Sequence, residues 1–465
     1  MMRVAPDYSG KLLGVEMAEE KQRYGGRTNE PERTQQPGGE RQPSPRHAVA
    51  GPVLVAPPPI ADITELPLPS GGLEEMNVLA FGAGDAWDAF LKGPAKAYAA
   101  KYSMKYIFID IMSEKDGLAR VRGFDIGNDR VEYVEMPKLA AAGPTDEYKR
   151  RLTAKLEGKK ISGVIVALPP ILHCTAMELA AGMNVPIFVQ KPFVLTPDQC
   201  QRVRKLPDDV QKRIVALDGD FDKSVVLKAL KYLHENPGKF GALASIESET
   251  LILGTEERKP YLRDGLYLDL APHALAQVAM GLHMFGMSLA DFRTDKERSF
   301  LARYEGAFDG RETYAHHALI DEKTGVKIDL KAGKGVKAGD RGIPIIRVVF
   351  RDRSGASLTI DHITGVFELR DGNGHVAHSE NCPEPLPGHP YANDGRKTLH
   401  VARYGDMSPR EQEFRLQAGL DIIEAIHGVM AAKDVPLIMA EGGGVLQFRP
   451  EKYRTYKAGE DPETA

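Results

Sequence analysis

Two short apolar runs with a helix-like segment between them form the clearest pattern in the chain. The first run, 164–168, is rich in β-branched residues, and the second, 185–189, leads to Lys191. Residues 172–181 between them are mostly apolar and predict a helix. Apolar runs on both sides of a helix predict a βαβ unit whose strands are buried in a parallel sheet. Because ligands bind beyond the carboxyl ends of such strands, Lys191 is expected to face a cleft.

A second strand–helix unit lies upstream. The run 77–81 predicts a strand, and residues 86–102 predict a helix. Gly82 and Gly84 lie between them, in the context of a dinucleotide-binding loop, where glycines let the pyrophosphate approach the helix N-terminus. Trp87 stands at the place of the usual third glycine, so the turn alone does not distinguish a dinucleotide loop from an ordinary βα turn.

The next predicted strand, 106–109, ends at an acidic residue, Asp110. An acid at this position is placed to bind both ribose hydroxyls, which favours NAD over NADP. A solvated residue that merely ends a strand is the alternative interpretation. Residues 113–160 are charged and less regular, and they predict a helical patch near 146–156 and an extra hairpin or loop beyond a minimal crossover.

The pattern as a whole predicts an α/β protein in four parts. Residues 1–75 are rich in Pro, Gly, Gln and charge, and predict a disordered extension or an arm on a partner subunit. Residues 76–218 predict a Rossmann dinucleotide-binding domain with a doubly wound parallel sheet. Residues 219–448 predict an α+β substrate and oligomerisation domain with a large mixed or antiparallel sheet. Residues 449–465 form a charged tail. Alternating strands of the second domain are predicted at 244–253, 314–321, 326–330, 345–350 and 357–363.

Composition narrows the class of protein. The 465 residues are 42% hydrophobic and 27% charged with a net charge of −4, which gives no reason to expect nucleic acid or a membrane as partner. The three cysteines are widely spaced, which favours a reduced, cytoplasmic protein. Residues 266–290 are apolar but contain Asp269 and His283, and are too polar to span a bilayer.

The motifs, taken in order, resemble those of the Gfo/Idh/MocA oxidoreductases over residues 76–444. They are the strand–Gly-x-Gly–helix unit, Pro-Pro-x-x-His ending at His173, Gln190-Lys191-Pro192, and Asp-x-x-x-His from Asp269 to His273. The resemblance implies hydride transfer between a nicotinamide and the CH–OH or C=O carbon of a sugar, cyclitol or related polyol derivative. It implies NAD as cofactor, with NADP possible. It also implies the cofactor-binding residues, which are Gly82, Gly84, Asp85, Ala86, Asp110, Leu168, Pro169, His173 and Gln190.

The residue chemistry supports the same function. Removal of a hydride from a CH–OH carbon requires a base for the hydroxyl proton, and histidine suits this role near neutral pH. Asp269 and His273 are four residues apart, so both face one side of a helix. We expect His273 to act as acid/base, Lys191 to donate a hydrogen bond to the reacting oxygen, and Asp269 to orient the substrate. The alternatives are a helix cap at Asp269, an interior His273 and a surface Lys191.

Gln190 and the segment 218–223 complete the predicted site. Gln190 replaces the glutamate that usually precedes the lysine in this family. Residues 218–223 bear a weak resemblance to the substrate loop of glucose-6-phosphate dehydrogenases, but Gly219 replaces its histidine. Asp218 and Lys223 of this segment are therefore predicted to contact substrate. The other histidines lack metal-ligand grouping, so no metal is predicted.

Two other functions stay open from the sequence. The first is a nucleotide-binding sensor or scaffold without turnover, and the second is an NAD-dependent glycosidase-type enzyme without net redox change. A homodimer or homotetramer is also expected, because a large open sheet face usually packs against a copy of itself.

Overall fold

The first of the two sheets formed by the described residues has six parallel strands in the order β3-β2-β1-β4-β5-β6. The computed structural model describes residues 51–465 except 66, 70–71, 85, 88–90, 253–265, 305–311, 313, 335–344, 387–390, 433–434, 436, 441–453 and 457–465. The strands are β1 Met76–Phe81, β2 Met104–Asp110, β3 Val131–Glu135, β4 Ile161–Val166, β5 Ile187–Val189 and β6 Ile214–Ala216. The strand order reverses between β1 and β4, which is the switch point at which doubly wound sheets bind ligands. The predicted Rossmann fold is confirmed.

Helices cover this sheet, and several begin at the caps that their sequences provide. They are α1 Lys92–Tyr98, α2 Glu114–Arg122, α3 Asp146–Lys155, α4 His173–Ala180, α5 Pro197–Arg204 and α6 Asp208–Gln211. The side chains of Ser113, Thr145 and Thr196 each accept a backbone N–H in the first turn of the helix that follows. The segment 113–160 forms α2, β3 and α3 in place of the predicted extra hairpin or loop, and α3 matches the helical patch predicted near 146–156. Strand β3 was not predicted from the sequence because it is an edge strand with only two buried residues.

Trp87 lies inside the first domain and not on the surface of the Gly-x-Gly turn. Its side chain is 1% exposed. The indole packs edge-on against Phe108, with ring centroids 4.7 Å apart, and stacks on Phe124 at 6.1 Å. Trp87 therefore fills the space between helix and sheet that the usual third glycine leaves for close packing.

The second sheet of the described residues has eleven strands and is mixed. Its order is β15-β14-β13-β12-β7-β11-β10-β9-β16-β17, with β8 paired to β10. Most neighbours are antiparallel, but β7 with β11 and β9 with β16 are parallel. The strands are β7 Leu243–Ile252, β8 Arg293–Thr294, β9 Phe300–Tyr304, β10 Tyr314–Ile320, β11 Lys327–Lys334, β12 Ile345–Asp352, β13 Ser357–Asp361, β14 Val366–Arg370, β15 Val376–Asn381, β16 Leu437–Ala440 and β17 Arg454–Tyr456.

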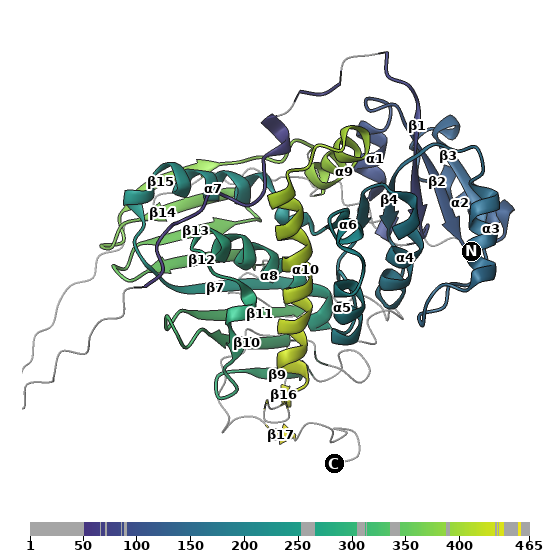
Figure 1. Ribbon diagram of the computed structural model, residues 1–465. Helices are drawn as coiled ribbons and strands as arrows, with labels where there is room; N and C mark the ends of the chain where they lie inside the picture. The colour runs from purple at the N-terminus through teal and green to yellow at the C-terminus, as the bar shows by residue number, and fades with distance from the viewer. Residues whose placement is uncertain are drawn as a thin grey trace, which may run out of the picture. The chain divides into compact units, whose positions relative to one another are not determined.

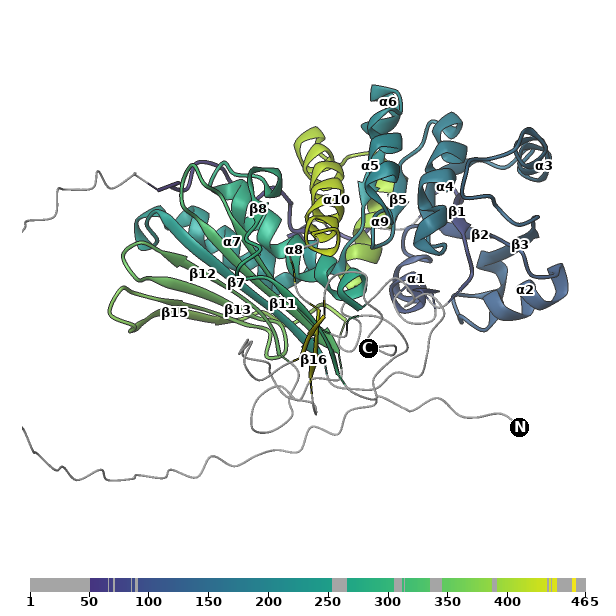
Figure 2. The same cartoon turned by 90° about the horizontal axis from the view of Figure 1, so that it is seen from below.

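One face of this sheet is covered by helices and the other carries ion pairs. Helices α7 (Ser224–Glu235) and α8 (Leu266–Met284) lie on the covered face (Figure 2). On the other face, Lys331 pairs with Glu247 and Glu249, at 3.0 and 3.1 Å, and Arg347 also pairs with Glu249. The open face is therefore charged over β7, β11 and β12. The expected homo-oligomer stays a prediction.

The last two long helices return to the Rossmann sheet. Helix α9 (Ala392–Tyr404) packs against α1 and β4, and α10 (Pro409–Met430) packs against β6, α5 and α8 (Figure 1). Ser408 caps α10 by accepting the backbone N–H of Glu411, as the Ser-Pro-x-Glu sequence predicts. Both domains therefore share a core built by residues distant in sequence.

Residues 51–65, part of the extension predicted as disordered or as an arm on a partner subunit, run along their own chain as an arm. The carbonyl of Pro52 accepts the N–H of Leu243, and the N–H of Val55 donates to the carbonyl of Met284, both at 2.8 Å. Ile60 is 3% exposed, so apolar burial supports these bonds. Residues 1–50 and most of the predicted tail lie outside the described residues. None of the described helices is both long and apolar enough to cross a membrane.

The stability of the second domain is expected to fall below pH 6.5 because of His317. Its ring is fully buried between Tyr267 and Thr294. Burial and the neighbouring His316 lower the pKa of His317 to about 3, so the folded protein keeps it neutral. The unfolded chain takes up a proton below its ordinary pKa of about 6.5, and the stabilisation lost by pH 5 is about 2 kcal/mol.

Urea unfolding at pH 7.5, 6 and 5 tests this expectation. The wild-type free energy of unfolding should fall more steeply with decreasing pH than that of His317→Gln. Parallel curves for the two proteins would contradict it.

Candidate active site

Lys191 and Asp269 meet where the two domains join. Lys191 follows β5 at the carboxyl edge of the Rossmann sheet, and Asp269 lies in the first turn of α8. The Lys191 ammonium donates to Asp269 Oδ1 at 2.7 Å and to the Asp269 backbone carbonyl at 3.0 Å. The Lys191 side chain is 12% exposed, so its ammonium is largely screened from bulk water. The structure therefore gives Asp269 a direct contact that fixes Lys191.

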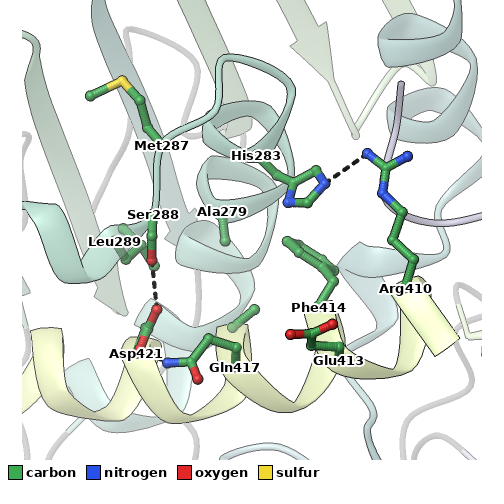
Figure 3. A pocket seen from close by; sticks show the side chains of 11 residues that line it. Ala279, His283, Met287, Ser288, Leu289, Arg410, Glu413, Phe414, Gln417 and Asp421 are labelled. Atoms are coloured by element: carbon green, nitrogen blue, oxygen red, sulfur yellow. Dashed lines mark hydrogen bonds between the residues drawn. The ribbon is translucent and has the colours of Figure 1, made fainter. Parts of the chain in front are cut away.

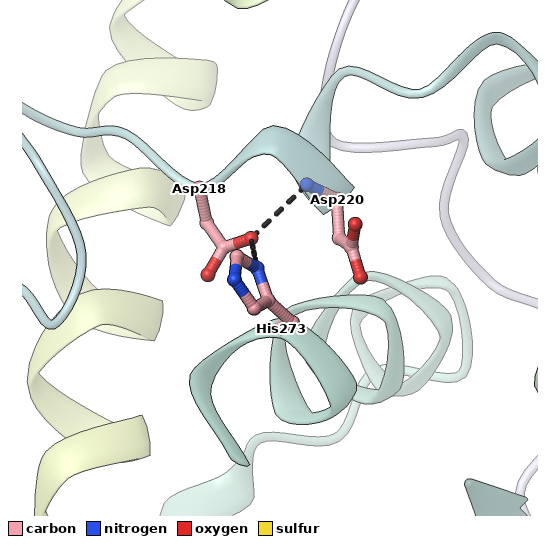
Figure 4. A group of neighbouring side chains, drawn as sticks. All are labelled: Asp218, Asp220 and His273. Atoms are coloured by element: carbon pink, nitrogen blue, oxygen red, sulfur yellow. Dashed lines mark hydrogen bonds and ion pairs between the residues drawn. The ribbon is translucent and has the colours of Figure 1, made fainter. Parts of the chain in front are cut away.

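His273 lies one turn after Asp269 and is bonded to Asp218, the residue that follows the strand β6 by two positions. His273 Nδ1 and Asp218 Oδ1 are 2.8 Å apart (Figure 4). Because an ionised carboxylate only accepts hydrogen bonds, this contact places the proton on Nδ1 and leaves Nε2 as the basic nitrogen. Asp218 is 3% exposed, and its other oxygen, Oδ2, has no partner among the described residues. The pair is an aspartate–histidine dyad.

The turn after Asp218 supplies a second ion pair. Asp218 accepts the backbone N–H of Asp220, and the Lys223 ammonium lies 2.6 Å from Asp220 Oδ1. Burial opposes ionisation of Asp220, but Lys223, His362 and His273 together lower the pKa of Asp220 well below its usual range. Gln277, one turn beyond His273 on α8, donates to Asp220 Oδ2 at 2.7 Å. The substrate candidates Asp218 and Lys223 thus lie next to the catalytic candidates.

The atoms of Asp218, Asp220 and His273 also lie within 4.8 Å of one another, a spacing compatible with a metal (Figure 4). The contacts just described account for this grouping without one. His273 Nδ1 is bonded to Asp218, and the two oxygens of Asp220 are bonded to Lys223 and to Gln277. Hydrogen bonds and one ion pair thus hold the group together, and among the described residues they leave Asp218 Oδ2 without a partner.

The Gly-x-Gly loop fits a dinucleotide. Gly82 has a φ of 92°, and a Cβ there would lie 2.5 Å from the Ala167 carbonyl, so only glycine suits this close approach. A Cβ on Gly84 would have no atom within 4 Å, so the backbone at Gly84 borders open space. Ala86 continues the loop into a helix, and Asp85 lies outside the described residues. Bare backbone facing open space at the start of a helix is the geometry that binds pyrophosphate.

Asp110 lies beside this loop, at the end of β2. Its Oδ2 accepts the N–H of Ala83 at 2.7 Å, and its Oδ1 accepts the N–H of Ile111 at 2.6 Å. A second acid, Glu135, ends the neighbouring strand β3 and accepts the N–H of Glu114 at 3.0 Å. Two carboxylates therefore lie at the ends of the neighbouring strands β2 and β3, next to the Gly-x-Gly loop.

His173 does not lie open to a cofactor. Its ring is 1% exposed, and its nitrogens contact the carbonyls of Leu168 at 2.7 Å and of Pro192 at 3.1 Å. Burial lowers the pKa of His173. The ring thus ties the turn after β4 to the turn that carries Lys191. Gln190 is 5% exposed and accepts the N–H of Lys191, while its Nε2 has no partner among the described residues.

A buried network of charged residues, which was not predicted from the sequence, binds Asp222 of the turn 218–223. Arg415 of α10 binds both oxygens of Asp222 at 2.7 Å and Glu411 at 2.9 Å. Lys397 of α9 lies 2.8 Å from each of these two acids. Lys397 also donates to the Ala61 carbonyl of the arm. Each member of this Asp222–Arg415 network is at most 7% exposed, and alternating charges balance one another.

A cavity of about 320 Å³ lies between α8 and α10 and is separate from these groups. Two hydrogen bonds join residues of its lining: Arg410 donates to His283, and Ser288 donates to Asp421 (Figure 3). None of the predicted catalytic residues lines it. Its lining consists of Ala279, His283, Met287, Ser288, Leu289, Arg410, Glu413, Phe414, Gln417, Ala418 and Asp421.

Comparison with known proteins gives structural matches only. No model of a protein family and no curated protein sequence matches the chain. Glucose-6-phosphate 1-dehydrogenase from Mycobacterium avium matches 80% of this chain and 94% of its own, at 17% identity and a TM-score of 0.58. KijD10, a 3-ketoreductase from Actinomadura kijaniata solved with NADP and TDP-benzene, matches 80% and 99%, at 14% identity and a TM-score of 0.55. A Gfo/Idh/MocA family oxidoreductase from Vibrio cholerae matches 76% and 97%, at 13% identity and a TM-score of 0.51. The chain has the two-domain fold of these oxidoreductases.

Proposed function

We propose that this protein is an NAD(P)-dependent oxidoreductase of the Gfo/Idh/MocA type. It transfers a hydride between the nicotinamide and the CH–OH or C=O carbon of a sugar, cyclitol or related polyol derivative. One observation carries the proposal: Lys191 and the Asp218–His273 dyad converge beyond the carboxyl edge of the Rossmann sheet, where the Gly-x-Gly loop fits a dinucleotide. The similar structures include a sugar-phosphate dehydrogenase and a ketoreductase bound to NADP, which supports this class of reaction.

A nicotinamide held at the Gly-x-Gly loop would supply the hydride acceptor or donor, and the residues of the protein bind the substrate, move the proton and stabilise the charge. His273 Nε2 accepts the proton of the substrate hydroxyl, and Asp218 stabilises the resulting imidazolium through Nδ1–H. The Lys191 ammonium donates a hydrogen bond to the reacting oxygen and stabilises its developing negative charge. Asp269 keeps Lys191 in place, and is therefore a positioning residue in this proposal.

We also propose that NAD is preferred over NADP, because Asp110 and Glu135 both stand at the ribose end of the site. Trp87 lies under the loop and emits where NADH absorbs, so quenching of its emission reports binding. NADH is expected to bind at least about tenfold more tightly than NADPH, a difference of about 1.4 kcal/mol. Asp110→Ser should reduce that preference at least about tenfold by removing a charge that repels the 2′-phosphate.

The matched control for this titration is Asp129→Ser, an exposed acid in the turn before β3, which should keep the wild-type preference. Mass spectrometry of nucleotide released by denaturation shows whether cofactor already fills the site. Tighter binding of NADPH would contradict the role of Asp110. Absorbance at 340 nm with a panel of hexoses and inositols then tests turnover. Nucleotide binding without any turnover would favour the scaffold, and consumption of a glycoside without net NADH would favour the glycosidase-type reaction.

A further inference from the structure

His362 joins the active site through a chain of hydrogen bonds that begins at Asp220. It follows β13, on the sheet of the second domain. Its Nε2 lies 2.8 Å from Oε1 of Gln277, whose Nε2 in turn lies 2.7 Å from Asp220 Oδ2. Gln277 is one helical turn beyond His273, so these hydrogen bonds lie next to the Asp218–His273 dyad.

The donors and acceptors in this chain leave one consistent assignment. Asp220 is ionised and only accepts hydrogen bonds, so the Gln277 amide must present its NH₂ group to it. The amide oxygen of Gln277 then faces His362 and only accepts, which places the proton of His362 on Nε2. His362 Nδ1 consequently carries a lone pair and is a hydrogen-bond acceptor.

This acceptor is buried and has no partner among the described residues. Buried polar atoms are nearly always paired, so an unpaired one in an active site indicates a position that a ligand fills. Burial and the nearby Lys223 lower the pKa of His362 to about 3, which keeps the imidazole neutral. Charge interactions with Lys223, Asp220 and His273 show that the ring belongs to the same group of residues.

We propose that His362 is a substrate-binding residue whose Nδ1 accepts a hydrogen bond from a hydroxyl of the substrate, close to the carbon that is oxidised. This inference rests on the proposed function and narrows its substrate class. A neutral hydroxyl provides the hydrogen that Nδ1 lacks, whereas a phosphate or carboxylate oxygen provides none. The substrate group at this position is therefore a hydroxyl and not a phosphate.

Two substitutions test the roles of the two ring nitrogens of His362 separately. His362→Gln keeps an amide nitrogen near the position of Nε2, so it retains the bond to Gln277 but loses the acceptor. His362→Asn keeps an oxygen acceptor near the position of Nδ1 and loses the bond to Gln277. KM and kcat are measured with NAD and the best neutral hexose or inositol of the panel, and NADH binding is measured through Trp87.

We expect His362→Gln to raise KM at least about tenfold, with NADH binding unchanged, because a site built to pair with a hydroxyl loses that contact. His362→Asn should keep KM within about threefold of wild type, because the acceptor remains. An unchanged KM in His362→Gln, or an equal increase in both variants, would overturn the inference.

Deoxy analogues of the same substrate give a second measurement that uses the unmodified protein. One monodeoxy analogue should bind the wild-type protein as weakly as the parent substrate binds His362→Gln. The affinity of this analogue should not fall further when His362 is replaced by glutamine. If every analogue loses affinity equally in both proteins, His362 does not contact a hydroxyl. Absence of wild-type turnover with the whole panel would overturn the proposed function itself, whereas turnover with an insensitive His362 overturns this inference alone.

Discussion

Replacement of His273 by alanine is expected to lower kcat by about 10³-fold, with NADH binding unchanged. The reason is that Nε2 of His273 is the basic nitrogen that the dyad with Asp218 leaves free. Without it, the hydroxyl proton has no acceptor at the moment the hydride leaves. Asp218→Asn should cause a loss of similar order, because the amide no longer fixes the proton on Nδ1. Steady-state turnover and Trp87 quenching measure the two quantities separately.

His283→Ala is the matched control for this experiment. His283 lies on the same helix, but it lines the cavity between α8 and α10 and bonds to Arg410, away from the dyad. Its substitution should leave kcat unchanged. If His273→Ala keeps kcat within tenfold of wild type, the acid/base role belongs to another group, and Lys191 is the next candidate.

Replacement of Arg415 by methionine is expected to reduce the free energy of unfolding by about 3–5 kcal/mol. Arg415 is fully buried and makes two bonds to Asp222 and one to Glu411. Methionine fills part of the volume but leaves two buried carboxylates with Lys397 as their shared cation. Removing one partner of a buried ion pair leaves an uncompensated charge, which costs more than the pair itself contributes.

Chemical denaturation measures this loss, with Arg204→Met as the control. Arg204 also bonds to a residue of α10, Glu424, but the pair is about one-third exposed. Loss of such a pair typically costs less than about 1 kcal/mol. Equal losses in the two variants would contradict the importance of burial at Arg415. The double variant Asp222→Asn with Arg415→Met should be more stable than Arg415→Met alone, because it removes one of the unpaired charges.

The sequence predicted the first domain well because its signals are local. The apolar runs that became β4 and β5, and the helix between them, are continuous segments whose burial needs no knowledge of the rest of the chain. The same holds for the strand–glycine–helix unit and for Asp269 and His273, which one helical turn brings to one face. The edge strand β3 was missed because only two of its five residues are buried.

The remainder of the site depends on contacts between distant segments. Nothing local links Asp218 to His273, although both were predicted near substrate, because their bond joins the end of β6 to a helix of the second domain. His362 lies far from the site in sequence and is bonded to it through Gln277. His173 belongs to a matched motif, but its ring serves the backbone around Lys191 and is closed to a cofactor. Sequence position does not distinguish these two uses of a histidine.

The arm at residues 51–65 has a consequence for the order in which the protein is assembled. Ala61 is synthesised early, yet it bonds to Lys397, 336 residues later, and to Glu411, 350 residues later. The ribosome must therefore release the chain beyond Glu411 before Ala61 can form these two bonds, whereas Leu243 and Met284, which bond to Pro52 and Val55, emerge much earlier. The Rossmann strands have their partners much sooner, since β1 to β6 lie within residues 76–216. The buried charge network next to the turn 218–223 is thus completed only when α9 and α10 have emerged and residues 51–65 pack against them.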